Sequence, residues 1–133
     1  MPARIPGNVE MLKLLLDEQI SPEVAEGLRR RRGDLEVKCL AEWEQGKFLG
    51  LADELFLAEA ARQRITLVTY DRRTIPPVLK RWAEEGRSHG GAVFVDRETI
   101  PSSDFGGLIR ALEKLRNETS EWDWTDRIVT LRR

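Results

Sequence analysis

The sequence predicts an α/β fold: a three-layer α/β/α sandwich around a mostly parallel sheet of about five strands. Short apolar runs alternate with helical patterns along the chain. This alternation is typical of strand–helix–strand units, whose right-handed crossovers build a parallel sheet. The two clearest runs each end in an acid, and 133 residues with 41% hydrophobic content suffice for one domain with a buried core.

This single domain is expected over residues 11–133. Residues 1–10 contain two prolines and one glycine without an apolar period, and we expect them to be a loose N-terminal extension. The first strand is predicted over Leu12–Leu16, ending at Asp17. A helix then begins at Ser21-Pro22-Glu23, because serine can cap, proline is tolerated in the first turn and glutamate favours the positive end of the helix dipole.

The helix is expected to end in the basic run Arg29–Arg32, followed by Gly33, and a short second strand is predicted near Leu35–Leu40. Residues 41–50 show no clear period and are interpreted as a loop that overhangs the rim of the sheet. Trp43 and Phe48 in this loop either stack on nucleobases or are buried against the core.

The next helix is predicted from Leu51, with one stripe formed by Leu51, Leu55, Ala58 and Arg62. The third strand follows over Ile65–Tyr70 and ends at Asp71.

The remaining elements follow the same alternation. Ile75-Pro76-Pro77 opens a helix that stops near Gly86, and Gly91–Val95 forms the fourth strand. Ser102-Ser103-Asp104 caps the most strongly periodic helix of the chain. A closing strand is predicted near Arg127–Leu131, after two tryptophans that are interpreted as exposed and available to a homodimer, Trp122 and Trp124.

Composition limits the classes of partner and compartment. The 22 lysines and arginines nearly balance the 23 aspartates and glutamates, so no overall basic field exists and a polyanion must be held locally. Cys39 is the only cysteine; it excludes an intrachain disulfide and is interpreted as a small buried residue. Without a secretory signal or an apolar run of about 18 residues, we expect a cytoplasmic protein that does not contact membranes.

Acidic residues recur at the predicted carboxyl edge of the sheet. Asp17, Asp71 and Asp96 each follow a predicted strand, and Asp53 opens the helix that precedes the third strand. Parallel strands carry their C-terminal ends to one edge, where open α/β sheets place their ligands. Carboxylates crowded there repel one another unless a hard cation such as Mg²⁺ neutralises them. The alternative is that each acid only caps a helix or faces water.

Three segments carry a resemblance to a known family. These are Leu14-Leu15-Leu16-Asp17-Glu18, Gly50-Leu51-Ala52-Asp53-Glu54 and Leu67-Val68-Thr69-Tyr70-Asp71-Arg72. They resemble the PIN-like family (the DUF5615 group, related to Mut7-C and VapC-type toxin nucleases). The resemblance implies a PIN-like α/β/α fold and an endoribonuclease that uses Mg²⁺ or Mn²⁺, either a toxin with a protein antitoxin or an RNA-processing enzyme.

The resemblance also implies roles for individual residues. Asp17, Asp53 and Asp71 match the catalytic, metal-binding acids, and Asp96 is a candidate for a fourth metal ligand. Thr69 either positions a carboxylate or a metal-bound water, or is only a strand residue. Arg72 and Arg73 lie beside Asp71 and are expected to hold RNA phosphates, because guanidinium groups bind phosphate in a bidentate manner.

Two alternative functions stay open. The family often has a second aspartate where this chain has Arg73, which favours a non-catalytic interaction module with a degraded metal site. A phospho-acceptor receiver domain also has acids after its first and third strands. It normally needs a lysine near the end of the last strand, where this chain has Leu131-Arg132-Arg133. The lone His89 lacks the spacing of a metal ligand and is interpreted as a loop residue.

Overall fold

The computed structural model describes residues 12–31, 33 and 35–133, so the extension expected at residues 1–10 lies outside the described part of the chain. Five strands form one sheet in the order β2-β1-β3-β4-β5. Every pairing between neighbouring strands is parallel, which makes the sheet fully rather than mostly parallel. The strands are β1 (Lys13–Leu16), β2 (Glu36–Cys39), β3 (Thr66–Thr69), β4 (Ala92–Val95) and β5 (Ile128–Leu131).

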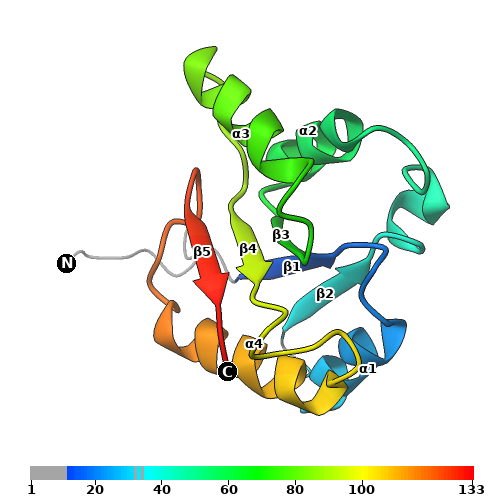
Figure 1. The fold of residues 1–133 in the computed structure, drawn as a ribbon. Helices are drawn as coiled ribbons and strands as arrows, with labels where there is room; N and C mark the ends of the chain where they lie inside the picture. Colours follow the sequence, from blue (N-terminus) through cyan, green and yellow to red (C-terminus); the bar gives the residue numbers. More distant parts are fainter. Residues whose placement is uncertain (1–11, 32, 34) are drawn as a thin grey trace.

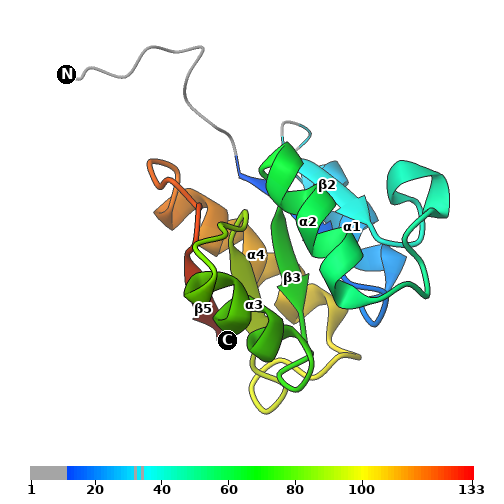
Figure 2. The same cartoon turned by 90° about the horizontal axis from the view of Figure 1, so that it is seen from above.

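Four α-helices complete the predicted three-layer α/β/α sandwich. Figure 1 shows α1 and α4 on one face of the sheet and α2 and α3 on the other. Seen from above, β2 and β5 lie at opposite edges of the sheet (Figure 2). The helices are α1 (Pro22–Arg31), α2 (Asp53–Gln63), α3 (Ile75–Glu84) and α4 (Phe105–Glu118).

The central strands are apolar on both sides because both faces of the sheet are covered. Leu14, Leu15 and Leu16 of β1 are all fully buried. Successive strand residues point to opposite faces, so Leu14 and Leu16 belong to the core beneath α1 and α4, whereas Leu15 belongs to the core beneath α2 and α3. This is why a continuous apolar run, not an alternating one, marks each central strand in the sequence.

Two predicted helix caps are confirmed by their hydrogen bonds, whereas the helix predicted from Leu51 begins at Asp53. At α1 the backbone N–H of Glu23 donates to Ser21 Oγ at 3.2 Å. At α4 the N–H of Gly107 donates to Asp104 Oδ1 at 2.9 Å. Each side-chain oxygen accepts from an N–H that has no partner within the helix.

Two details of the second helix region differ from the prediction. The expected loop at residues 41–50 contains a short 3₁₀ helix, η2 (Trp43–Gly46). The stripe predicted for α2, which includes Leu55, faces solvent. Leu55 is 52% exposed, whereas its neighbours Phe56 and Leu57 are buried. Three consecutive apolar residues fit either helix face, and packing of the larger Phe56 against the sheet decides between them.

The tryptophans contribute to the interior. Trp43 and Phe48 are both buried and stack with ring centroids 5.2 Å apart, so burial is the correct alternative and neither presents a ring to a nucleobase. Trp124 is buried and Trp122 packs against the same core, which makes the prediction of exposed tryptophans wrong. Cys39 is buried, as expected.

Candidate functional site: acids at the carboxyl edge of the sheet

The strand order places a topological switch point between the carboxyl ends of β1 and β3. The chain leaves β1 toward β2 on one side, then crosses back through α2 to β3 on the other side of β1. The connections that follow β1 and β3 therefore diverge, and such a switch point is where open α/β sheets bind ligands. Asp17 directly follows β1, and Asp71 comes two residues after β3.

Asp17 is the buried acid at this switch point. Its side chain accepts hydrogen bonds from Thr69 Oγ1 (2.6 Å, to Oδ2) and from the N–H of Glu18 (2.8 Å, to Oδ1). Burial raises the pKa of the Asp17 carboxyl above its usual value, and the negative charges of Asp53 and Asp71 raise it further, against the lowering effect of these two hydrogen bonds. Three acids remote in sequence therefore lie within electrostatic reach of one another.

Thr69 connects two of these acids. Its side chain is fully buried, its Oγ1 donates to Asp17, and the same oxygen accepts from the N–H of Asp71 at 2.9 Å. Of the two interpretations of Thr69, the geometry matches that of a residue that positions a carboxylate.

Asp71 forms the turn that begins α3. Its Oδ1 accepts from the N–H groups of Arg73 (2.8 Å) and Thr74 (2.9 Å), and its Oδ2 accepts from Thr74 Oγ1. Partial burial acts to raise the pKa of Asp71, but the hydrogen bonds from Thr74 and Arg73 and the Arg73 charge outweigh it and lower the pKa. Asp71 therefore stays ionised at neutral pH.

Asp53 is the first residue of α2 and is partly exposed. Within the described residues, the Asp53 carboxylate forms no hydrogen bond and no ion pair. Its negative charge repels that of Asp17 and so helps to raise the pKa of Asp17. Glu54 next to it forms an ion pair with Arg81, which joins the start of α2 to α3. Asp53 is thus the member of the set that is available to an incoming cation.

Asp96 follows β4 as predicted, yet its carboxylate is used locally. Oδ1 accepts from the N–H of Glu98 at 3.1 Å, and Oδ2 lies 3.4 Å from Nε of Arg132. The structure therefore places Asp53 and Asp71 within electrostatic reach of Asp17, whereas the carboxylate of Asp96 is engaged by the Glu98 N–H and by Arg132.

The basic residues after β5 are also paired. Arg132 contacts Asp96, and Arg133 forms an ion pair with Asp104. At the other basic run, Arg29 Nη2 donates to the carbonyl of Val37 at 2.7 Å, and Arg31 pairs with Glu113 at 2.8 Å. These arginines therefore join neighbouring helices and strands.

The acids fit a divalent cation by donor type and charge. A buried carboxylate whose pKa is raised by burial and by two neighbouring carboxylates is stabilised by a cation placed among them. Among the residues that the structure describes, however, no group of three His, Cys, Asp or Glu side chains is arranged as a set of metal ligands. Mg²⁺ commonly uses one or two carboxylates and keeps several waters, so its binding does not require three side chains that are already in place.

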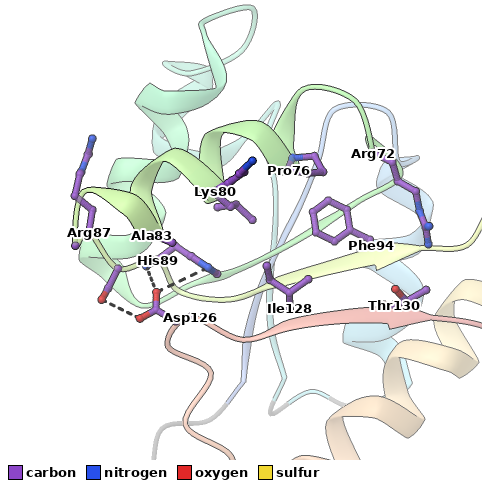
Figure 3. A pocket seen from close by; sticks show the side chains of 13 residues that line it. Arg72, Pro76, Lys80, Ala83, Arg87, His89, Phe94, Asp126, Ile128 and Thr130 are labelled. Atoms are coloured by element: carbon purple, nitrogen blue, oxygen red, sulfur yellow. Dashed lines mark hydrogen bonds and ion pairs between the residues drawn. The ribbon is translucent and has the colours of Figure 1, made fainter.

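A second feature, a groove between α3 and β5, was not predicted. Its volume is about 780 Å³, and Arg72 lines the end nearest to Asp71. Figure 3 shows the helix side formed by Pro76, Lys80 and Ala83 and the strand side formed by Ile128 and Thr130. The spacing of Pro76, Lys80 and Ala83 in the sequence could have indicated this groove, because it places the three residues on one helix face.

His89 lies at the far end of this groove, opposite Arg72 (Figure 3). Its side chain is buried, its Nδ1 accepts from the N–H of Gly91 at 3.0 Å, and its Nε2 lies 3.8 Å from Asp126. Burial lowers the pKa of His89, against the raising effect of Asp126. Protonation would turn Nδ1 into a donor and break the bond to Gly91.

We expect His89 to make the fold sensitive to mild acid. Because its pKa is lower when folded, the unfolded chain binds the proton first, and its stabilising contribution is complete above about pH 6.5 and is lost as the pH falls further. Thermal unfolding from about pH 7.5 to about pH 5 should show a larger drop in Tm for the wild type than for His89→Asn, whose amide oxygen can accept from Gly91 without titrating. Equal drops would contradict this assignment.

Comparisons with family models, with curated proteins and with solved structures give no match to this chain. Across the described part of the chain, no helix is both long enough and apolar enough to cross a membrane.

Proposed function

We propose that this protein is an endoribonuclease of the PIN-like type, dependent on Mg²⁺ or Mn²⁺, with its site at the switch point between the carboxyl ends of β1 and β3. The observation that supports the proposal most directly is the buried carboxylate of Asp17, whose pKa is raised mainly by burial and, to a smaller extent, by the negative charges of Asp53 and Asp71. A cluster of carboxylates at a ligand-binding switch point suits a hard cation and a phosphodiester substrate.

In this proposal Asp17, Asp53 and Asp71 hold the cation. When bound, a divalent cation supplies activation of water for in-line attack and stabilises charge on the phosphate oxygens. Thr69 holds the Asp17 carboxylate through its hydroxyl, and the N–H groups of Arg73 and Thr74 keep Asp71 ionised. Arg72 and Arg73 are exposed beside Asp71 and are proposed to bind phosphates of the substrate.

The test is hydrolysis of single-stranded RNA by purified protein, first stripped with chelator and then supplied with Mn²⁺ or Mg²⁺. We expect cleavage only with the metal. Binding should also raise the Tm, because a ligand at ten times its Kd adds about 1.4 kcal/mol to the free energy of unfolding. If neither cleavage nor a metal-dependent rise in Tm is observed with either metal, the proposal is wrong.

A non-catalytic interaction module is the second candidate, and one observation favours it. Both oxygens of Asp71 already accept hydrogen bonds in the turn before α3, and the described residues contain no ready-made group of three ligands. Metal titration by calorimetry separates the candidates, since this module would bind neither Mg²⁺ nor Mn²⁺ at millimolar concentration. A cytoplasmic location and a protein antitoxin belong to the leading proposal as its biological setting.

A further inference from the structure

The groove between α3 and β5 has an excess of positive charge. Arg72, Lys80 and Arg87 line it, against one carboxylate, Asp126. That carboxylate is already engaged, because it accepts from Ser88 Oγ and from the N–H of His89, each at 3.0 Å. The charge of the groove therefore favours an anionic occupant.

The three basic side chains of the groove differ in whether they already have partners. Arg87 lies over the ring of Trp82, 4.1 Å from its centroid, and 3.8 Å from Glu85. Arg72 and Lys80 form no ion pair with any residue in the described ranges. An unpaired arginine and lysine along one groove are the groups that bind successive phosphates of a nucleic acid backbone.

The floor of the groove is apolar. Ile128 of β5 is 57% exposed, and it lies beside Phe94 and opposite Ala83 and Pro76 (Figure 3). None of the helices in the described part of the chain covers this side of β5, since α3 lies over the neighbouring strands (Figure 1). A single strand exposes the faces of its bases to such a surface, whereas a duplex keeps its bases stacked inside and offers mainly its backbone.

The groove also begins beside the turn that carries Asp71. Arg72 lines its near end and directly follows Asp71 in the turn between β3 and α3. We propose that the groove between α3 and β5 binds a single-stranded segment of the RNA substrate, with phosphates at Arg72 and Lys80 and bases or riboses against Ile128. This inference rests on the proposed function, because it supplies the path by which the strand reaches Asp17.

The test is the binding of fluorescent oligouridine, measured by anisotropy in excess chelator so that no cleavage occurs. Lys80→Glu should weaken binding by about tenfold or more and lower the salt dependence of log K by at least about 0.7, the value for one phosphate contact on a single strand. Lys114→Glu is the matched control, because Lys114 is a 75% exposed lysine on α4, in the opposite layer. It should bind within about twofold of the wild type.

Ile128→Ser probes the floor of the groove at an exposed position where folding should be little affected. It should weaken binding of the single strand and leave binding of an RNA duplex unchanged. In parallel, oligouridine containing 4-thiouridine should crosslink to peptides from α3 and β5 in the wild type, and this crosslink should be lost in Lys80→Glu.

Equal binding by Lys80→Glu and Lys114→Glu, or crosslinks confined to α1 and α4, would overturn the inference. So would a result in which Lys80→Glu abolishes binding of a polyglutamate peptide but not of RNA, because the occupant would then be an acidic protein segment. Cleavage assays separate the two proposals. If the wild type cleaves RNA with metal and Lys80→Glu binds RNA normally, the nuclease proposal stands and the groove is not the RNA-binding site. If RNA binding depends on Lys80 but no cleavage occurs, the groove binds RNA and the nuclease proposal is wrong.

Discussion

Asp17→Asn should abolish RNA hydrolysis and at the same time make the fold more stable. Loss of a partner that only orients a metal ligand typically costs about 10- to 100-fold in metal affinity or activity, so we expect loss of the buried ligand itself to cost at least about a hundredfold in rate. The metal-dependent rise in Tm should disappear as well. RNA cleavage and thermal unfolding with and without Mn²⁺ measure these effects.

The expected gain in stability follows from the sign of the pKa shift. The pKa of Asp17 is raised in the folded state, so the folded protein binds the proton more tightly than the unfolded chain does. Folding therefore carries a penalty at neutral pH that shrinks as the pH falls below the raised pKa and is gone below the ordinary pKa of an aspartate. Asparagine removes the charge, and its amide can accept from the Glu18 N–H and donate to Thr69 Oγ1. Because the Thr69 hydroxyl then loses its acceptor, the net gain in stability is smaller than the penalty removed.

Asp96→Asn is the matched control, because Asp96 also follows a strand but its carboxylate is engaged by the Glu98 N–H and by Arg132. It should retain most of the activity. Activity in Asp17→Asn equal to that of the wild type would remove Asp17 from the catalytic site, and a loss in Asp96→Asn as large as in Asp17→Asn would show that the grouping of the acids is wrong.

Thr69→Val should destabilise the protein by about 3 kcal/mol. Valine has nearly the same shape but leaves the Asp71 N–H and Asp17 Oδ2 without their partner, and each unsatisfied buried group costs about 1–3 kcal/mol. Denaturant unfolding measures the change in the free energy of unfolding. Thr69→Ser keeps the hydroxyl and removes only a methyl group, so it should cost about 1 kcal/mol.

Thr69→Val should also lower RNA hydrolysis by about 10- to 100-fold, because Thr69 positions Asp17 and the backbone of Asp71. A merely structural role predicts instead that Thr69→Val and an equally destabilising core variant lose the same activity. Since Thr69 acts through Asp17, the effects of Thr69→Val and Asp17→Asn on hydrolysis should not add in the double variant. Additive effects would contradict the positioning role.

Much of the fold was predictable because its signals are local. The apolar run ending at Leu16, the cap at Ser21 and the cap at Asp104 each depend on residues within one turn or one strand. The errors arose where local signals are ambiguous. Leu55, Phe56 and Leu57 fit either helix face, and Trp122 and Trp124 are hydrophobic residues whose burial depends on packing against distant helices and strands.

The candidate site divides in the same way. The sequence by itself determined that Asp17, Asp71 and Asp96 follow strands and that Asp53 begins a helix, because each position depends on local periodicity. Only the tertiary structure decided that Asp53 and Asp71 act on Asp17, that Thr69 joins Asp17 to Asp71, and that Asp96 pairs with Arg132. The physical reason is that strand order and side-chain partners are set by packing between segments far apart in the chain, which no local pattern encodes.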